Sequence, residues 1–306
     1  MPEPPLASDR ARELVRGGVD PHVHVSPDVV DRRIDDVTLA RRLGELGVAG
    51  VVLKSHYTST AERAAVVRGV VPDVMTLGAV TLNRAVGGMN ALAVEIAAQE
   101  GARVVWMPTV DALNETAGRT EPRAGEKVPV WAAVQRGLRE RGIVVEPVAV
   151  VDTDGRLLPE TREVLQTVAA NGLVLATGHL SRDEIVAVVD GAIEAGVGVI
   201  VVTHPEFPSQ SLSDDDQRAL AAKGALLERC FTTPHTGKVS WERWLAATRA
   251  TGPEHCVLGS DLGQLDNPPV EDGLALMADR LLEAGFSEDD VHTMAVTNTR
   301  RVAGLI

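Results

Sequence analysis

The sequence predicts an α/β protein folded as a (β/α)8 TIM-type barrel. Three observations favour this fold. Apolar, β-rich runs alternate with amphipathic helical segments along most of the 306 residues. Eight such runs can be counted, which is the strand number of a closed parallel barrel. Histidines follow several of these runs directly, and barrel enzymes carry their chemistry at the carboxyl ends of the strands.

Composition narrows the class of protein further. The formal net charge is −13, hydrophobic residues make up 44% and aromatic residues only 3%, so the core is expected to be aliphatic. The acidic balance argues against a nucleic-acid partner. Residues 1–8 lack the features of a signal peptide, and no apolar run reaches about 18 residues. We therefore expect a cytoplasmic protein with a small-molecule substrate and no membrane association. A homo-oligomer is compatible with this composition, although no stretch marks an interface.

The first four strand–helix units are regular. Gly47 is expected to end the first helix, and Ser59 with Glu62 forms a capping box for the second. Gly87 and Gly88 indicate a turn after the third strand. The expected strands are 19–25, 48–56, 74–80 and 102–107, and the expected helices are 36–47, 59–68 and 89–100.

The repeat is then interrupted. Residues 110–128 are polar and contain Gly118, Pro122 and Gly125, which predicts a long loop of the kind that is often functional. A helix at 129–141, an extra strand at 143–151 and a turn at 152–155 are expected to follow. This stretch is too short to build its own core easily. We therefore predict one barrel domain, 1–306, with 110–156 as an insertion and lid region between strands four and five.

The regular pattern resumes after the insertion. Ser181 with Glu184 forms another capping box. The alternative fold is a doubly wound open sheet, but neither G-x-G-x-x-G after the first strand nor a P-loop is present. The expected strands are 173–177, 197–203, 225–230 and 256–261, and the expected helices are 159–170, 181–195, 213–223, 240–251, 271–285 and 288–303.

The first strand contains two histidines in the stretch V-D-P-H-V-H-V. Because side chains alternate along a strand, Asp20, His22 and His24 are expected on one face. Two neutral imidazoles on one face suit a divalent metal. Asp20 can accept the second N–H of such a ligand and fix its tautomer. The alternative is a solvated histidine pair in a loop.

The other histidines strengthen the metal hypothesis. Six of the eight lie at or just after predicted strand ends, and Asp261 ends the eighth strand. A ring of imidazoles with one carboxylate can hold a metal that activates water and polarises a carbonyl or phosphoryl oxygen. His255 and His292 lie elsewhere. The six are His22, His24, His56, His179, His204 and His235.

These motifs resemble the amidohydrolase superfamily of metal-dependent barrels over most of the chain. The resemblance rests on His-Val-His after strand one, T-G-H-L and V-T-H-P after strands five and six, and G-S-D-L after strand eight. It implies that His22, His24, His179, His204 and Asp261 bind one or two divalent metals or the metal-bound water. It also implies that Asp261 takes a proton from this water and passes it to the leaving group. Zinc is the expected metal, with manganese or iron as alternatives.

One position departs from the superfamily pattern. Many members bridge two metals with a carboxylated lysine or a glutamate at the end of strand four, where this chain has W-M-P-T. Lys54, at the end of strand two, is the best substitute, since a buried lysine must find a partner or lose its charge. We expect it to be carboxylated and to bridge the metals. The alternatives are a salt bridge to Asp261 or to a substrate carboxylate.

Four further residues are candidates for contact with substrate or ligands. His56 lies near Lys54, and His235 follows strand seven. Asn83 and Asp111 follow strands three and four, where turn capping is the alternative role. Trp106, Cys230 and Cys256 are expected in the core, without a disulfide framework.

The sequence thus predicts a metal-dependent hydrolase of the amidohydrolase type. A metal-bound hydroxide would attack a small-molecule amide, cyclic imide, lactam or lactone. The alternatives are a phosphoester hydrolase, a single-metal decarboxylase or hydratase, and a barrel kept only for binding. Basic residues near the site would favour phosphoesters, and Arg84 and Lys54 are the main ones that the sequence places at strand ends.

Overall fold

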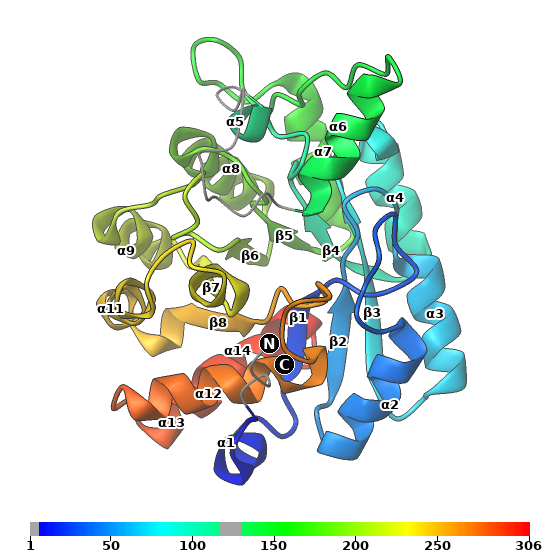
Figure 1. The fold of residues 1–306 in the computed structure, drawn as a ribbon. Coiled ribbons are helices and arrows are strands. Elements are labelled where there is room, and N and C mark those ends of the chain that lie inside the picture. The colour runs from blue at the N-terminus through cyan, green and yellow to red at the C-terminus, as the bar shows by residue number, and fades with distance from the viewer. Residues whose placement is uncertain (1–5, 117–129) are drawn as a thin grey trace.

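The computed structural model describes residues 6–116 and 130–306. The described residues form eight parallel strands that follow one another in chain order around one sheet. Figure 1 shows the strands at the centre of the molecule with helices around them. The predicted (β/α)8 barrel is confirmed. The strands are β1 (Val19–Val23), β2 (Gly50–Leu53), β3 (Met75–Thr81), β4 (Ala102–Trp106), β5 (Val174–Ala176), β6 (Val199–Val202), β7 (Leu226–Cys230) and β8 (Cys256–Gly259).

The barrel closes between β1 and the segment that follows β8. The backbone N–H of His24 donates to the carbonyl of Leu262, and that of Asp261 donates to the carbonyl of His22, both at 2.8 Å. Val23 and Leu262 form a parallel bridge at the same place. This seam brings the beginning of the chain beside residues near its end.

The helices pack their apolar faces on the sheet and begin and end at recognisable caps. Asp35 accepts from the N–H of Thr38 at the start of α2, and Gly47 ends this helix with φ +73°, as predicted. The capping box of Ser181 and Glu184 is present at α8. The helices are α1 (Asp9–Leu14), α2 (Asp36–Leu46), α3 (Ala61–Val70), α4 (Ala91–Gln99), α5 (Leu113–Thr116), α6 (Val130–Glu140), α7 (Pro159–Ala170), α8 (Arg182–Ala195), α9 (Asp214–Ala222), α10 (Thr232–His235), α11 (Trp241–Thr251), α12 (Gly273–Glu283), α13 (Glu288–His292) and α14 (Asn298–Ala303).

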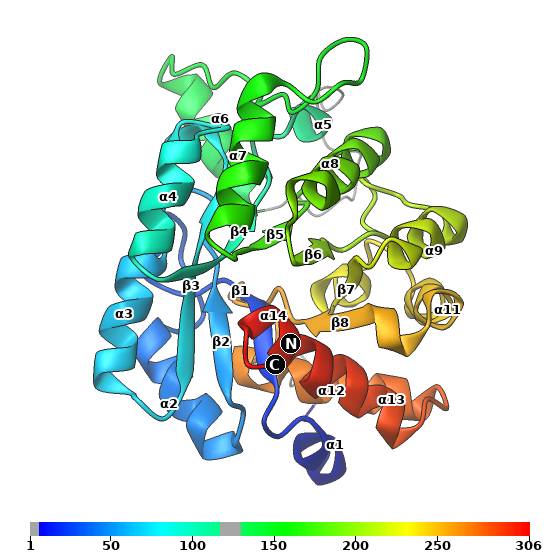
Figure 2. The same ribbon diagram turned by 180° about the vertical axis from the view of Figure 1, so that it is seen from behind.

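Mostly aliphatic side chains fill the interior of the barrel. One buried cluster contains residues from β2 to β8, among them Val52, Val104, Val201 and Val257. Each such side chain contributes about 1.5–3 kcal/mol by leaving water. Figure 2 shows α14 crossing the molecule beside β1, and its Val302 joins the same cluster. The barrel is therefore filled at this end, and only its other end is available for a site.

The extra strand predicted at 143–151 is wrong. This segment forms only isolated bridges, between Ala112 and Val148 and between Val151 and Leu157. Because β4 pairs directly with β5, the barrel offers no free edge to another strand. Val144 accordingly stays 75% exposed.

Three other local expectations are corrected. The capping box of Ser59 and Glu62 does not form, because α3 begins at Ala61 with Thr60 as its N-cap. The hydroxyl of Thr60 donates to the carbonyl of Leu53 instead. The expected helix 288–303 is divided into α13 and α14 by a π-helical turn at Thr293–Thr297. Within the expected loop 110–128, α5 is helical, while 117–129 lie outside the described residues.

The helices of the described segments all fall short of the length and hydropathy that crossing a bilayer requires.

Candidate metal centre

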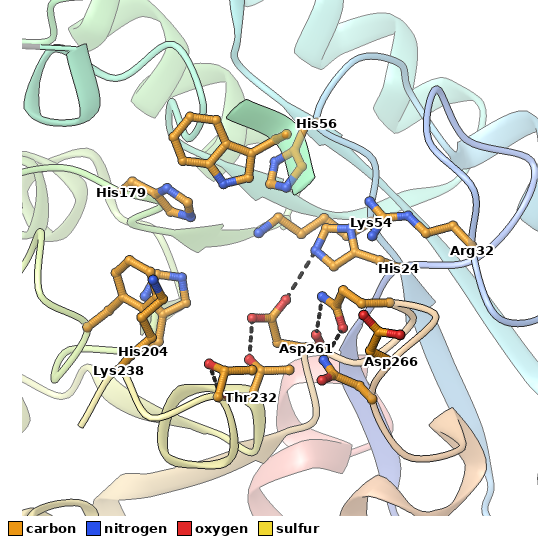
Figure 3. Close-up of a pocket in the computed structure, with 15 residues that line it drawn as sticks. His24, Arg32, Lys54, His56, His179, His204, Thr232, Lys238, Asp261 and Asp266 are labelled. Atoms are coloured by element: carbon orange, nitrogen blue, oxygen red, sulfur yellow. Dashed lines mark hydrogen bonds and ion pairs between the residues drawn. The ribbon is translucent and has the colours of Figure 1, made fainter. Parts of the chain in front are cut away.

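Side chains from the carboxyl ends of the strands converge on one pocket of about 400 Å³ (Figure 3). Trp106 lies beneath them in the barrel core, as predicted. The predicted site residues that line the pocket are His24, Lys54, His56, His179, His204 and Asp261.

His22 lies at the bottom of this group and is completely buried. Its Nδ1 is 3.0 Å from Oε1 of Glu228, a buried carboxylate on β7. Burial raises the pKa of Glu228, but contacts with His22 and the charges of His204 and Lys54 outweigh it and leave this pKa below its usual value. Because an ionised carboxylate only accepts hydrogen bonds, Nδ1 carries the proton. In the neutral ring Nε2 then presents its lone pair to the pocket.

Asp261 joins the two histidines of β1. Its Oδ1 lies 3.3 Å from Nε2 of His22 and 3.2 Å from Nε2 of His24, and Oδ2 accepts a hydrogen bond of 2.6 Å from Thr232. Burial opposes its ionisation, but the neighbouring His22, His24 and Lys54 hold the pKa of this carboxyl well below its usual range. Asp261 also has φ +52°, a conformation that L residues rarely adopt and that often marks functional sites.

Lys54 follows β2 directly and is 1% exposed. Its Nζ lies 3.0 Å from Nε2 of His22 and 5.0 Å from the ring centroid of Trp106. Among the described residues it forms no ion pair with Asp261. Burial lowers the pKa of Lys54, although the charges of Asp261 and Glu228 oppose this. The ammonium group is therefore poorly stabilised here.

His179 and His204 form the opposite wall of the site. Their ring centroids are 4.9 Å apart, and the ring of His204 lies 6.4 Å from that of His22. Nδ1 of His179 is 3.1 Å from Oε1 of Glu115 on α5. Burial lowers the pKa of His204 to about 3, so its ring is neutral. His204 has φ +26°, a second left-handed residue at the site.

These donors suit a divalent metal. Nε2 of His22, Nε2 of His24 and a carboxylate oxygen of Asp261 all lie within 4.8 Å of one another. Nδ1 of His24 and Nδ1 of His204 are buried without a hydrogen-bond partner in the part of the chain that the structure describes. The lone pairs of Nε2 of His22 and of Oδ1 of Asp261 meet at 3.3 Å, and they repel one another unless a cation lies between them. Neutral imidazole with carboxylate is also the donor set that zinc, manganese and iron accept.

The expected role of Asp20 is corrected. Its Oδ1 accepts from the backbone N–H groups of His22 and Ser260, at 3.1 and 3.0 Å, and not from an imidazole. Burial raises the pKa of Asp20 to about 6. Asp20 thus ties β1 to the end of β8, and Glu228 makes the contact that we expected of it.

The remaining candidates divide into two groups. His56 borders the pocket, with its Nδ1 2.8 Å from the hydroxyl of Thr109. Asn83 instead donates to the carbonyl of His56 and accepts from the N–H of Thr109, which ties three strand ends together. Asp111 accepts from the N–H of Arg84 and from Gln135 of α6. Asn83 and Asp111 therefore have the capping roles that were their alternative.

His235 and Arg84 point elsewhere. His235 is on α10, where its ring stacks on Phe231 with centroids 4.8 Å apart, and it is not among the described residues that line the pocket. Arg84 donates to the carbonyls of Glu146 and Pro147 in the insertion. Neither residue is among the described residues that line the pocket.

The sequence does not predict several residues of the site, and Glu228, Arg32 and Glu115 are the charged ones nearest the histidines. Glu228 was detectable, because a Glu-Arg pair inside an apolar barrel strand places charge where both faces are buried. Arg32 lies in a polar loop with no periodic signal, and Glu115 lies in the insertion. Both surround the site, Arg32 beside His24 and Glu115 beside His179.

Solved structures with the same fold include hydrolases. The probable dipeptidase PvdM from Pseudomonas aeruginosa is 11% identical, with 97% of each chain covered and a TM-score of 0.62. A putative 2-pyrone-4,6-dicarboxylic acid hydrolase from Pseudomonas putida is 17% identical over 94% of this chain and 97% of that one, with a TM-score of 0.57. An amidohydrolase from Burkholderia multivorans with bound zinc is 12% identical over 94% and 99%, with a TM-score of 0.51. At these identities the likeness confirms the resemblance to amidohydrolases at the level of the fold.

A search of curated proteins gives no match to this chain. One family model covers residues 17–228, which is more than half of the sequence, and it is described as a family of unknown function, DUF6282. The matched range contains β1 to β6 and ends within β7. The chain belongs to this family of unknown function, DUF6282.

Proposed function

We propose that this protein is a metal-dependent hydrolase that cleaves a C–N or C–O bond in a small-molecule amide, cyclic imide, lactam or lactone. The observation that carries the proposal is the convergence of Nε2 of His22 and Nε2 of His24 on Oδ1 of Asp261, at 3.3 and 3.2 Å, at the base of a pocket that His24 and Asp261 line. The hydrolases with the same fold support the same class of reaction.

The residues that would hold one or two metal ions are His22, His24, His179, His204 and Asp261. Zinc is the metal we expect, and the zinc-containing neighbour supports this choice. When bound, such a metal lowers the pKa of water and polarises the carbonyl of the substrate. Glu228 keeps the acceptor nitrogen of His22 turned towards it.

Asp261 would move the proton. Its lowered pKa keeps it ionised at neutral pH, so it can accept a proton from the attacking water and deliver it to the leaving nitrogen or oxygen. Thr232 donates to Oδ2 and so fixes the orientation of the carboxylate, which leaves Oδ1 directed at the two histidines. The pocket wall includes Trp131 of α6, so the insertion contributes to substrate selection.

Lys54 is proposed to be carboxylated and to bridge two metals. Burial lowers its pKa, and a neutral amine is the form that attacks carbon dioxide, with loss of one proton to give a carbamate. The product carries a negative charge beside His22, where an ammonium is poorly stabilised. The lysine would then supply the bridging carboxylate that the end of β4 lacks.

The proposed function is tested by metal content and hydrolysis together. We would measure metal per chain by elemental mass spectrometry after purification without chelators, and assay a panel of amides, cyclic imides and lactones. We expect one or two equivalents of metal and turnover of at least one class, with both lost in the His22→Ala/His24→Ala variant. Absence of metal after zinc, manganese and iron are offered back would contradict the proposal.

Phosphoester hydrolysis is the second candidate. A specific observation favours it, because Arg32, Lys54 and Lys238 all line the pocket, which is more positive charge than the sequence indicated. The same panel extended with phosphate mono-, di- and triesters separates the two reactions. Turnover confined to the phosphate esters would replace the first proposal with this one.

A further inference from the structure

We infer that the substrate carries a carboxylate group away from the bond that is cleaved, and that Arg32 binds this carboxylate. The inference rests on the proposed function, since it describes the substrate of that same pocket. It goes further by assigning a specificity-determining residue and a chemical class of ligand.

Arg32 is held in one orientation beside the metal centre. It lies in the loop between β1 and α2, its side chain is 5% exposed, and it borders the pocket next to His24. Figure 3 shows its guanidinium turned towards His24 and Lys54. Nε and one terminal nitrogen (NH2) both contact Oδ2 of Asp28 at 2.7 Å, and Asp28 is itself 1% exposed. A buried carboxylate on one edge of the guanidinium fixes its plane.

The other edge of this guanidinium has no protein partner. The second terminal nitrogen (NH1) forms no hydrogen bond within residues 6–116 and 130–306, and a guanidinium keeps two parallel N–H donors along its terminal edge. This nitrogen keeps some exposure, so water or a ligand in the pocket can reach it. Two parallel donors match the two oxygens of a planar carboxylate.

The loop that carries Arg32 is anchored. The backbone N–H of Arg33 donates to the carbonyl of Gly263, and its side chain donates to the carbonyls of Leu265 and Asn267. The loops after β1 and β8 therefore form one wall, and Gln264 of this wall also borders the pocket. Arg32 is in place before a ligand arrives, so binding does not require it to be ordered.

The charge around the pocket also favours an anion. Asp28 balances Arg32, and Asp261 and Asp266 are the carboxylates among the described lining residues. Lys238 lines the pocket as well, and a divalent metal would add further positive charge. On the other side the lining is aromatic, with Trp131 and Phe207. This combination suits an apolar body with one carboxylate.

The test uses small probes whose binding is measured directly. We would titrate the zinc-loaded protein with benzoate, benzamide and phenyl phosphate by isothermal calorimetry. The main variant is Asp28→Asn/Arg32→Gln, which removes both charges so that Asp28 is not left buried without a partner. Arg32→Lys keeps the charge but loses the paired donors. Arg41→Gln removes an exposed arginine of α2 and serves as the matched control.

We expect benzoate to bind at least tenfold more tightly than benzamide, and the double variant to lose at least about tenfold in benzoate affinity. The benzoate affinity of Arg32→Lys should lie between those of the wild type and the double variant, and that of Arg41→Gln should match the wild type. Equal binding of benzoate and benzamide, or equal benzoate binding by the wild type and the double variant, would overturn the inference. Tighter binding of phenyl phosphate than of benzoate would overturn the assignment to a carboxylate.

Because these readouts are affinities, they are independent of whether any panel substrate is hydrolysed. Turnover of neutral substrates with no preference for carboxylates would sink the inference and leave the proposed hydrolase standing. Selective benzoate binding without turnover of any panel member would support the inference about Arg32 and contradict the proposed hydrolase activity.

Discussion

Glu228 determines which nitrogen of His22 faces the pocket. Its carboxylate accepts a hydrogen bond from Nδ1–H at 3.0 Å, which leaves Nε2 able to hold a metal. The contact is completely buried, so water cannot replace it. Such carboxylate–histidine pairs typically change metal affinity when they are mutated, although they never touch the metal.

The variant Glu228→Gln should weaken metal binding. Its side-chain amide carries no charge and can donate to Nδ1, which would shift the proton of His22 to Nε2 and block the ligand position. We expect the dissociation constant for zinc to rise by about 10–100-fold, measured by competition with a chelating dye. Glu194→Gln, an exposed position on α8, is the matched control. Equal zinc affinity in both variants would show that Glu228 has no such role.

At the residue scale, the sequence identifies the proposed metal ligands more readily than the residues that hold them in place. His22, His24, His179, His204 and Asp261 are identifiable because each stands at a strand end, which barrel topology brings together. Their supports depend on which side chain reaches across the barrel, as when Glu228 on β7 meets His22 on β1. Packing decides which side chains meet across the barrel, and no periodic pattern in the sequence reveals these pairs.

Among the elements, the loop after β8 must approach β1 very closely. Gly263 has φ +136°, and a Cβ placed there would lie 1.5 Å from the carbonyl oxygen of His24. Only glycine permits this approach. The loop therefore holds the backbone of His24 and Asp261 together at the seam of the barrel.

The variant Gly263→Ala should separate these two segments. Gly172→Ala is the matched control, because Gly172 also has positive φ (+62°) but nothing lies within 4 Å of its would-be Cβ. Backbone strain should cost Gly172→Ala about 1–2 kcal/mol of unfolding free energy, measured by denaturant titration, and Gly263→Ala should lose more, because its Cβ would overlap the carbonyl oxygen of His24. Only Gly263→Ala should also lose metal affinity. If both variants bind zinc like the wild type, the close approach has no role in the site.

Helices and strands were predictable where the local sequence pattern agrees with the contacts that the barrel imposes, and they were not predictable elsewhere. The β-rich run at 143–151 contains valines suited to a strand, but pairing of β4 with β5 leaves it without a neighbour. The helix starting near 59 was misplaced because Thr60 turns its hydroxyl to Leu53, which no local rule predicts. In both cases tertiary contacts override propensity.

For the whole molecule, a bound metal should add to stability. A ligand that binds only the folded state at 100 times its dissociation constant contributes about 2.7 kcal/mol. Treatment with a chelator should therefore lower the Tm by roughly 4 °C or more in a thermal unfolding scan. Addition of zinc should restore the Tm. The His22→Ala/His24→Ala variant is the control, and a shift of equal size in this variant would mean that the metal binds elsewhere.

The order of strands around the barrel was predictable as a whole, because eight strand–helix repeats close in one way that keeps every edge paired. The pocket was not predictable at this scale. Its wall combines the loops after β1 and β8 with α6 of the insertion, and these segments are distant in sequence.

The closing seam affects when, during synthesis and folding, the chain can bind a metal. His22 and His24 leave the ribosome well before Asp261, whose backbone N–H donates to the carbonyl of His22. Contacts this distant in sequence form late in folding. A nascent or prematurely terminated chain can display its histidines, but it lacks the carboxylate that completes the ring. Metal retention would thus distinguish chains that have closed the seam from chains that have not.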